Sequence, residues 1–282
     1  MTVPLIIRVV ASLFLSSSIA YRGYRKRSLS RYGCVCAFFT GLLTTLSGYR
    51  NSAILLSFFF SSSTLTKYGA KHKKNLEDEY KEGGQRDSYQ VLSNSATATL
   101  LCLVYLYFYG MEEISLDFQQ DFFGSALLCA ILGHYACCNG DTWASELGIL
   151  SKSDPILITT GKRVKKGTNG GISMEGTAAS VAGGLFIGLI FYLSSLMTSS
   201  RSPLLVLLLG TLSGLMGSLI DSVLGATLQY SGWSEEKKKV VNQPEAGAHR
   251  ITGKEVLSNN SVNFVSAALT ALFTIPLGAL LL

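Results

Sequence analysis

The stretch "FFGSALLCAILGHYACC" (residues 122–138), followed at once by "NGDTWASELG" (residues 139–148), decides how this chain folds. The first segment contains no Asp, Glu, Lys or Arg. As a helix that rises about 1.5 Å per residue, it would cross most of the roughly 30 Å hydrocarbon core of a bilayer. The second segment presents two carboxylates, an amide and two hydroxyls. This order predicts a membrane-spanning helix that ends in a polar motif.

The composition of the whole chain agrees with this prediction. The chain has 282 residues, of which 48% are hydrophobic and 15% charged, and its mean hydropathy is +0.34. It is too apolar for an ordinary soluble domain, so we expect an all-α polytopic integral membrane protein. We predict a bundle of about eight transmembrane helices (7–9). The expected spans, of which the second and third are the weakest, are 2–20, 33–49, 51–66, 95–111, 122–138, 177–199, 203–226 and 262–282.

The basic residues orient these spans. If the loops after the first, third, fifth and seventh spans share one side of the membrane, that side carries all of the 24 Lys and Arg residues except Arg8, Arg50 and Arg201. Because positive loops stay in the cytosol, we predict that the N-terminus is out and that the large loops are cytosolic. Orientation and anionic lipid explain the net charge of +6 without a nucleic-acid partner.

The first apolar run has one feature of a secretory signal, because Ser18-Ile19-Ala20 offers small residues for cleavage. Arg8, however, interrupts the apolar region, and the positive residues follow the run rather than precede it. We therefore predict a retained helix. The chain divides into residues 1–32, an N-terminal transmembrane helix with a basic loop, and residues 33–282, the main transmembrane domain.

Small residues mark two of the later spans. Gly210 and Gly214 lie four residues apart in one span, and Gly184 and Gly188 have the same spacing in the span before it. Glycines at this spacing allow helix backbones to approach closely, so we expect both spans to pack tightly and the 203–226 span to lie centrally.

Three acidic residues are candidates for a metal site. Asp221 lies in an apolar helix, where an ionised carboxylate costs about 2.5 to 3.5 kcal/mol and needs a partner. Helical spacing lets Asp141 and Glu146 reach one cytosol-facing cavity, and carboxylate and hydroxyl oxygens suit Mg²⁺. Two alternatives remain open: Asp221 lies close enough to the cytosol to be hydrated, or Asn139 or Asp141 serves only as a helix cap.

A basic and glycine-rich loop is a candidate phosphate site. Lys162, Lys165 and Lys166 precede the turn Gly167–Gly171, whose amides we expect to converge on an anion. The GxxxxGK[ST] order of a Walker loop is absent. Asn263 lies with two further asparagines at the start of the last span, where a phosphate or a neighbouring backbone would satisfy its amide. His134 is expected to make a hydrogen bond between helices.

Several motifs together resemble a known family. They are "FFFSSSTLTK" (58–67), "GGQRDSYQVLSN" (83–94), "NGDTWASELG" (139–148), "GTNGGISMEGTAAS" (167–180), "GSLIDSVLGATLQY" (217–230) and "NNSVNF" (259–264). The chain resembles the animal transmembrane protein 19 family and its plant relative, phytyl-phosphate kinase. More distantly, residues 140–145 and 175–180 are similar to elements of dolichol kinase and phytol kinase.

This resemblance implies a membrane-embedded, CTP-dependent kinase domain over residues 33–282. It would transfer a phosphoryl group to an isoprenoid (polyprenyl or isoprenyl) monophosphate or alcohol, with ATP as a possible donor. Asp141, Glu146 and Asp221 would bind Mg²⁺ and, with Lys162, form the catalytic set. The nucleotide- and phosphate-binding set would be Lys165, Lys166, Thr168, Asn169, Gly170, Gly171, Thr177, Asn139 and Asn263.

Other functions remain alternatives at this stage. A cytidylyltransferase that forms a CDP-lipid would need a similar metal and nucleotide. A non-enzymatic multi-pass transporter or scaffold would use the same polar residues without chemistry. We expect the endoplasmic reticulum or another endomembrane to hold the protein.

Overall fold

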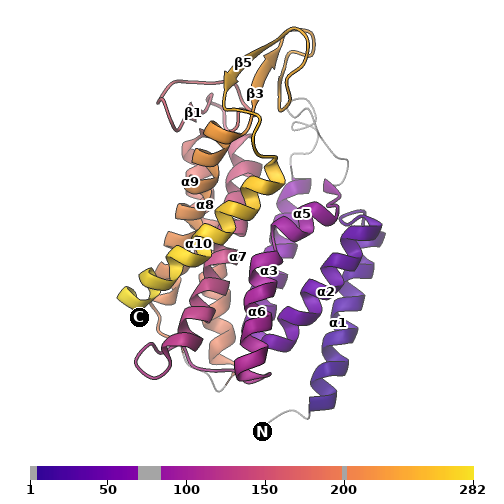
Figure 1. Ribbon diagram of the computed structural model, residues 1–282, viewed down its shortest axis with the longest axis vertical. Helices are drawn as coiled ribbons and strands as arrows, with labels where there is room; N and C mark the ends of the chain where they lie inside the picture. The colour runs from indigo at the N-terminus through magenta and orange to yellow at the C-terminus, as the bar shows by residue number, and fades with distance from the viewer. Residues whose placement is uncertain (1–4, 69–83, 199–201) are drawn as a thin grey trace.

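The computed structural model describes residues 5–68, 84–198 and 202–282, which form a bundle of helices with small β-sheets at one end (Figure 1). The helices are α1 (Leu5–Arg25), α2 (Arg31–Ser47), α3 (Tyr49–Lys67), α5 (Ser88–Ser93), α6 (Ala96–Tyr109), α7 (Phe122–Gly148), α8 (Met174–Leu196), α9 (Val206–Leu228) and α10 (Asn259–Leu281). A helix therefore occupies each of the eight predicted spans, and the predominantly helical fold is confirmed.

Five of these helices are long and apolar enough to cross a membrane, namely α1, α7, α8, α9 and α10. Helix α6 is apolar but has only 14 residues, and α2 and α3 are the two helices that we expected to be weakest. The exact number of crossings and the side on which the N-terminus lies stay predictions.

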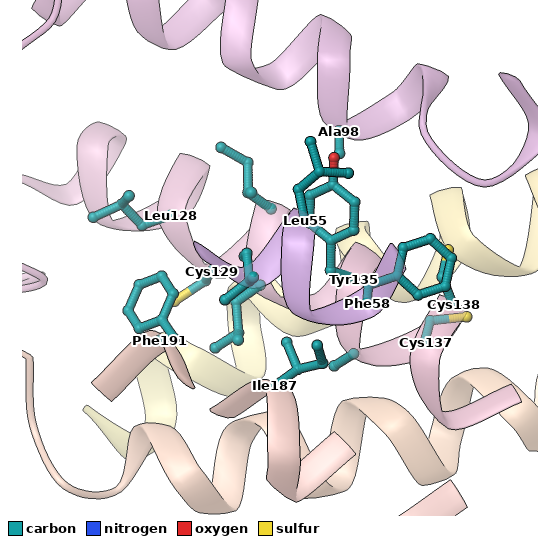
Figure 2. Close-up of a cluster of buried hydrophobic side chains, with 14 of the residues drawn as sticks. Leu55, Phe58, Ala98, Leu128, Cys129, Tyr135, Cys137, Cys138, Ile187 and Phe191 are labelled. Carbon is teal, nitrogen blue, oxygen red and sulfur yellow. The ribbon is translucent and has the colours of Figure 1, made fainter. Parts of the chain in front are cut away.

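Helix α7 is the centre of the bundle. Of its most apolar window, 89% is buried inside the protein, against 17% for α1 at the edge. Figure 2 shows Tyr135 of α7 beside Leu55 and Phe58 of α3, and Cys129 of α7 beside Phe191 of α8. The quoted segment 122–138 is thus apolar because protein, rather than lipid, surrounds it.

Helices α7, α8 and α9 approach at backbone distance, as the glycine spacing predicts. A Cβ atom on Gly184 would lie 2.4 Å from the carbonyl oxygen of Gly210, and one on Gly140 would lie 2.9 Å from that of Gly214. In lipid, helices gain little from hydrophobic burial, so close van der Waals contact of this kind supplies much of their attraction.

Hydroxyl and carboxylate caps begin the main helices. Asp121 accepts from the N–H of Gly124 at the start of α7, Ser173 from Gly176 at α8, and Ser258 from Ser261 at α10. Such caps satisfy backbone donors that a helix start leaves free. Helix α8 therefore begins at Met174, three residues before the predicted span 177–199.

Five short strands, which the sequence analysis did not anticipate, lie in the connections. β1 (Ile156–Leu157) pairs with β2 (Gly171–Ile172), and β3 (Ser231–Ser234) lies between β4 (Lys239–Val241) and β5 (Ala248–Thr252), all antiparallel. They lie at the end of the bundle that also holds α5, while α1 begins and α10 ends at the opposite end (Figure 1). The described parts of the loops that we assigned to one side share one end; residues 69–83 and Arg201 lie outside the described residues.

A buried ion pair closes the opposite end. Arg50 of α3 is fully buried, and its Nε lies 3.3 Å from Oε2 of Glu113 in the loop between α6 and α7. The same guanidinium donates to Ser202 at 3.1 Å and to the carbonyl of Ile114, and it lies over the ring of Phe191. This network ties three connections together where few apolar contacts are available.

The close approach of α8 and α9 can be tested with Gly184→Leu. We expect the side chain to push the helices apart and to lower the free energy of unfolding by about 1 to 3 kcal/mol. Thermal unfolding in detergent measures this change. Ala178→Leu, on the exposed face of α8, is the matched control; equal melting temperatures for the two variants would contradict the proposed contact.

The ion pair can be tested with Glu113→Gln, which leaves the buried guanidinium without a counter-charge. We expect a loss of about 3 to 5 kcal/mol in the free energy of unfolding. Glu112→Gln, at the neighbouring exposed position, should change it by less than about 0.5 kcal/mol. Denaturant titration of both variants checks the prediction, which fails if the two losses are alike.

Candidate functional site

A polar cavity of about 500 Å³ opens at the end of the bundle that carries the strands and α5. The end of α7, the starts of α8 and α10, the last turns of α9, the glycine turn before β2 and the segment 84–94 all line it. Segments far apart in the sequence thus supply one space, which is large enough for a nucleotide or a phosphorylated head group.

Two carboxylates from different helices meet in this cavity. Asp141 of α7 accepts a hydrogen bond from Ser218 of α9 at 3.4 Å, and Asp221 of α9 accepts one from Ser266 of α10 at 3.0 Å. The two are close enough for the charge of Asp221 to act directly on Asp141. The predicted pairing of Asp141 with Asp221 is therefore present in the fold.

Glu146 lines the same cavity but does not complete a three-carboxylate cluster. Among the residues that the structure describes, no group of three or more His, Cys, Asp and Glu side chains is arranged to hold a metal ion. The charge of Glu146 acts on Arg86, which lines the same cavity. Our prediction that all three carboxylates ligate one ion is corrected to a pair, Asp141 and Asp221.

The 139–148 motif divides into site residues and packing residues. Helix α7 runs through the whole motif without a break, so the alternative that Asn139 or Asp141 only caps a helix is wrong. Asn139 is fully buried and outside the cavity lining: its oxygen accepts from Ser61 at 2.8 Å, and its amide donates to the carbonyl of Gly183 at 2.9 Å. Asn139 therefore joins α3, α7 and α8. Its predicted role in binding a nucleotide or phosphate is not supported by this position.

The glycine turn forms a wall of the cavity, but most of its amides are not available for the predicted cradle. The N–H of Thr168 donates to Lys165, that of Asn169 to the hydroxyl of Ser231, and that of Gly171 to Thr168. These three donors are therefore already used, which leaves the N–H groups of Gly167 and Gly170 without a hydrogen-bond partner among the described residues. Gly170 has φ +75° and lies against α9, where a Cβ would be 2.5 Å from the carbonyl oxygen of Ser222, so only glycine fits there.

The three predicted lysines have different positions. Lys166 lines the cavity, where its ammonium donates to the carbonyl of Ser151. Lys162 is exposed outside the cavity, and Lys165 places its ammonium 5.4 Å above the ring of Trp233 in β3. The predictions that Lys162 is catalytic and that Lys165 binds phosphate are not supported by these positions, because the chain enters the cavity wall only at Lys166.

The remaining predicted residues lie in the cavity wall. Asn169 also ties the turn to the sheet, since its amide donates to the carbonyl of Tyr230 at 3.1 Å. Thr177 and Asn263 belong to the first turns of α8 and α10. Because the N-terminal end of a helix carries partial positive charge, these two turns favour an anion in the cavity.

Arg86, Gln90 and Asn94 line the cavity from the segment before α6. From the sequence, the 83–94 motif is expected to complete the site from its cytosolic loop, but neither spacing nor charge assigned a role to these three residues. The carbonyl of Asn94 accepts a hydrogen bond from His134 of α7 at 3.0 Å, if that ring nitrogen carries the proton. The predicted interhelical role of His134 is thus confirmed, and this contact holds the segment against the site.

Comparisons with known proteins agree with this architecture. The chain is 45% identical over 273 residues to Protein PGR of Arabidopsis thaliana, with 95% of each chain covered. It is 29% identical over 232 residues to an uncharacterized membrane protein of Methanocaldococcus jannaschii, covering 82% of this chain and 87% of that protein. It is also 27% identical over 217 residues to Protein VTE6, chloroplastic, of Arabidopsis thaliana, covering 76% of this chain and 61% of that protein.

No solved structure shows significant similarity to the chain. The family model described as "Integral membrane protein DUF92" matches residues 14–271. That range includes every segment that lines the polar cavity. The protein therefore belongs to the DUF92 family of integral membrane proteins.

Proposed function

We propose that this protein is a membrane-embedded phosphotransferase that moves the terminal phosphoryl group of a nucleoside triphosphate to an isoprenoid monophosphate or alcohol. The observation that carries the proposal is the polar cavity, which combines the Asp141 and Asp221 pair with Arg86, Lys166 and two helix N-termini. Phosphoryl transfer depends on positioning and on neutralising charge, and these groups serve both purposes.

The carboxylate pair fits Mg²⁺. Two carboxylates, each held by a hydroxyl of another helix, match the one or two protein carboxylates with which Mg²⁺ sites in phosphoryl-transfer enzymes are built. When bound, the ion would neutralise charge on the phosphate oxygens. Asp141 and Asp221 would hold it, and the phosphates and water would supply its remaining ligands.

The protein residues then orient the two substrates. The acceptor oxygen forms a bond to the terminal phosphorus of the donor, the bond from that phosphorus to the bridging oxygen breaks, and the nucleoside diphosphate leaves. A phosphate acceptor needs no deprotonation, whereas an alcohol must release a proton to a carboxylate of the cavity, such as Glu146. Lys166 offsets the negative charge of the nucleotide, and Arg86 offsets that of the acceptor.

The choice of CTP as donor and of an isoprenoid as acceptor rests on the resemblance to phytyl-phosphate kinase and the dolichol and phytol kinases. The similarity to the relative named VTE6 supports placing that protein and this chain in one broad family. For the location, we propose the endoplasmic reticulum or another endomembrane; because that relative is named chloroplastic, a plastid membrane is the alternative, and imaging of a fluorescent fusion distinguishes them.

A cytidylyltransferase is the second candidate, since the same cavity would hold the same donor. The products separate the two reactions: a kinase releases the nucleoside diphosphate, whereas a cytidylyltransferase releases pyrophosphate. A transporter is less well supported, because its site is expected near the bilayer midplane, between inverted repeats, and the polar cavity here lies at one end of the bundle.

The activity can be tested with purified protein, Mg²⁺, labelled CTP or ATP and a panel of isoprenoid monophosphates and alcohols. We expect a phosphorylated lipid together with the nucleoside diphosphate, and loss of turnover when a chelator removes the metal. Mass spectrometry of the products checks this. If no lipid of the panel is converted and no nucleotide binds, the protein is a scaffold rather than an enzyme.

The site can be tested with Asp141→Asn and Asp221→Asn. Each should lower kcat/KM by about 100-fold or more, because a preorganised charge that stabilises the transition state is lost. The control is Lys162→Ala, which alters an exposed lysine outside the cavity and should leave turnover unchanged within about twofold. Comparable losses in all three variants would show that the cavity is not the reaction site.

A further inference from the structure

A second, narrower cavity of about 70 Å³ adjoins the polar one. It lies between α1, α2, α3 and α5, and its walls are mostly apolar side chains, including Leu15, Ile19, Ala37, Leu55, Phe58 and Phe59. We call this space the apolar groove. The groove and the polar cavity share Arg86, Gln90 and Asn94 in their linings. The two spaces therefore meet along α5 and at the residues just before and just after it.

Arg86 is held firmly at this junction by its backbone. Its N–H donates to the carbonyl of Ser28 at 3.0 Å, and its own carbonyl accepts from the N–H of Ser30 at 2.9 Å. Gly33 permits this contact, because a Cβ there would lie 2.6 Å from the carbonyl oxygen of Arg86. The turn between α1 and α2 thus fixes where the Arg86 side chain starts.

The guanidinium of Arg86 is positioned to bind an anion. It lies over the ring of Phe58, 5.6 Å from the ring centre, and within the described part of the chain it makes no hydrogen bond and no ion pair shorter than 4 Å. Burial lowers the pKa of Arg86, and the charge of Glu146 opposes this change. An arginine side chain stays protonated in proteins, so the group is a cation. Five N–H donors remain available to a ligand.

The groove is bordered by the helix that is most exposed to lipid. Helix α1 packs chiefly on α2, and on its outer face Val10 and Phe14 are 58% and 74% exposed. On its inner face, Ser16 lines the groove against Gly41 of α2, where a Cβ would lie 3.2 Å from the Ser16 hydroxyl, so the two helices approach closely there. An amphiphile in the membrane therefore needs to pass only one peripheral helix to reach the groove.

We infer that the acceptor's hydrocarbon chain occupies the apolar groove and that Arg86 binds its phosphate head where the groove meets the polar cavity. This inference rests on the proposed function and adds where the lipid lies and which residue selects its head. A phosphate carries a charge of about −1.5 to −2 and pairs in a bidentate way with a guanidinium. Arg86 is thus a specificity residue for an anionic head, distinct from the carboxylate pair.

The experiment measures the binding of farnesyl monophosphate to the full-length protein in phosphatidylcholine nanodiscs, with farnesol and inorganic phosphate as separate probes. Arg86→Gln should weaken the binding of farnesyl monophosphate about 10- to 100-fold and leave farnesol unchanged, and Arg86→Lys should recover part of the loss. Nucleotide binding should stay within about threefold of the wild type.

The groove is tested with a matched pair on α2. Ala37→Phe fills the groove and should weaken the binding of both farnesyl monophosphate and farnesol by about 5-fold or more, whereas Val35→Phe, at a position that is 55% exposed, should leave both unchanged. Inorganic phosphate should respond to Arg86→Gln but not to Ala37→Phe. Melting temperatures confirm that each variant is folded.

The outcomes separate this inference from the proposed function. Wild-type protein that binds farnesyl monophosphate as described but transfers no phosphoryl group would refute the activity and keep the lipid site. The lipid site is wrong if the wild type does not bind farnesyl monophosphate, if Ala37→Phe and Val35→Phe behave alike, or if Arg86→Gln weakens nucleotide binding instead of lipid binding.

Discussion

The contact between the backbones of α7, α8 and α9 is the constraint on which the site depends. Gly140 of α7 lies against Gly214 of α9, and Gly184 of α8 lies against both Gly210 and Gly214. Asp141 directly follows Gly140, and Asp221 lies two turns beyond Gly214. Because the helices touch at these glycines without intervening side chains, the two carboxylates are brought into one cavity. Larger side chains at these glycine positions would move the helices apart and would separate the two carboxylates.

The polar groups of the two ends of the bundle serve different purposes. At the end without strands, Arg50 and Glu113 neutralise each other and close the structure. At the other end, Asp141 and Asp221 are like charges held together, with hydroxyls as their hydrogen-bond partners. Like charges at short range repel, so a proton or a bound cation must relieve this pair, and the proposed Mg²⁺ would do so. The Arg50 and Glu113 pair therefore stabilises the fold, whereas the Asp141 and Asp221 pair is the candidate for binding a ligand.

The fold was largely predictable, whereas the site was predictable in part. An apolar run predicts a helix because a membrane span must satisfy its own backbone hydrogen bonds, and this requirement holds for each run independently. Asp221 could be selected in the same way, since a carboxylate inside an apolar helix is costly by itself. The role of Arg86 could not be predicted in this way, because basic residues are common in charged loops. Only the structure shows that this part of the loop lines the cavity. Lys162 and Lys166 looked alike in the sequence, yet only one faces that cavity.

By itself, the sequence determined the class of protein, the positions of the helices and the residue types from which a phosphate site is made, because these follow from hydropathy and from local spacing. Only the tertiary structure decided that Asn139 packs between helices, that three amides of the glycine turn are already used, and that the charge of Glu146 acts on Arg86. The physical reason is that a hydrogen-bonding group acts on whatever lies within about 3 Å of it. In a bundle of helices, that neighbour comes from a distant part of the chain.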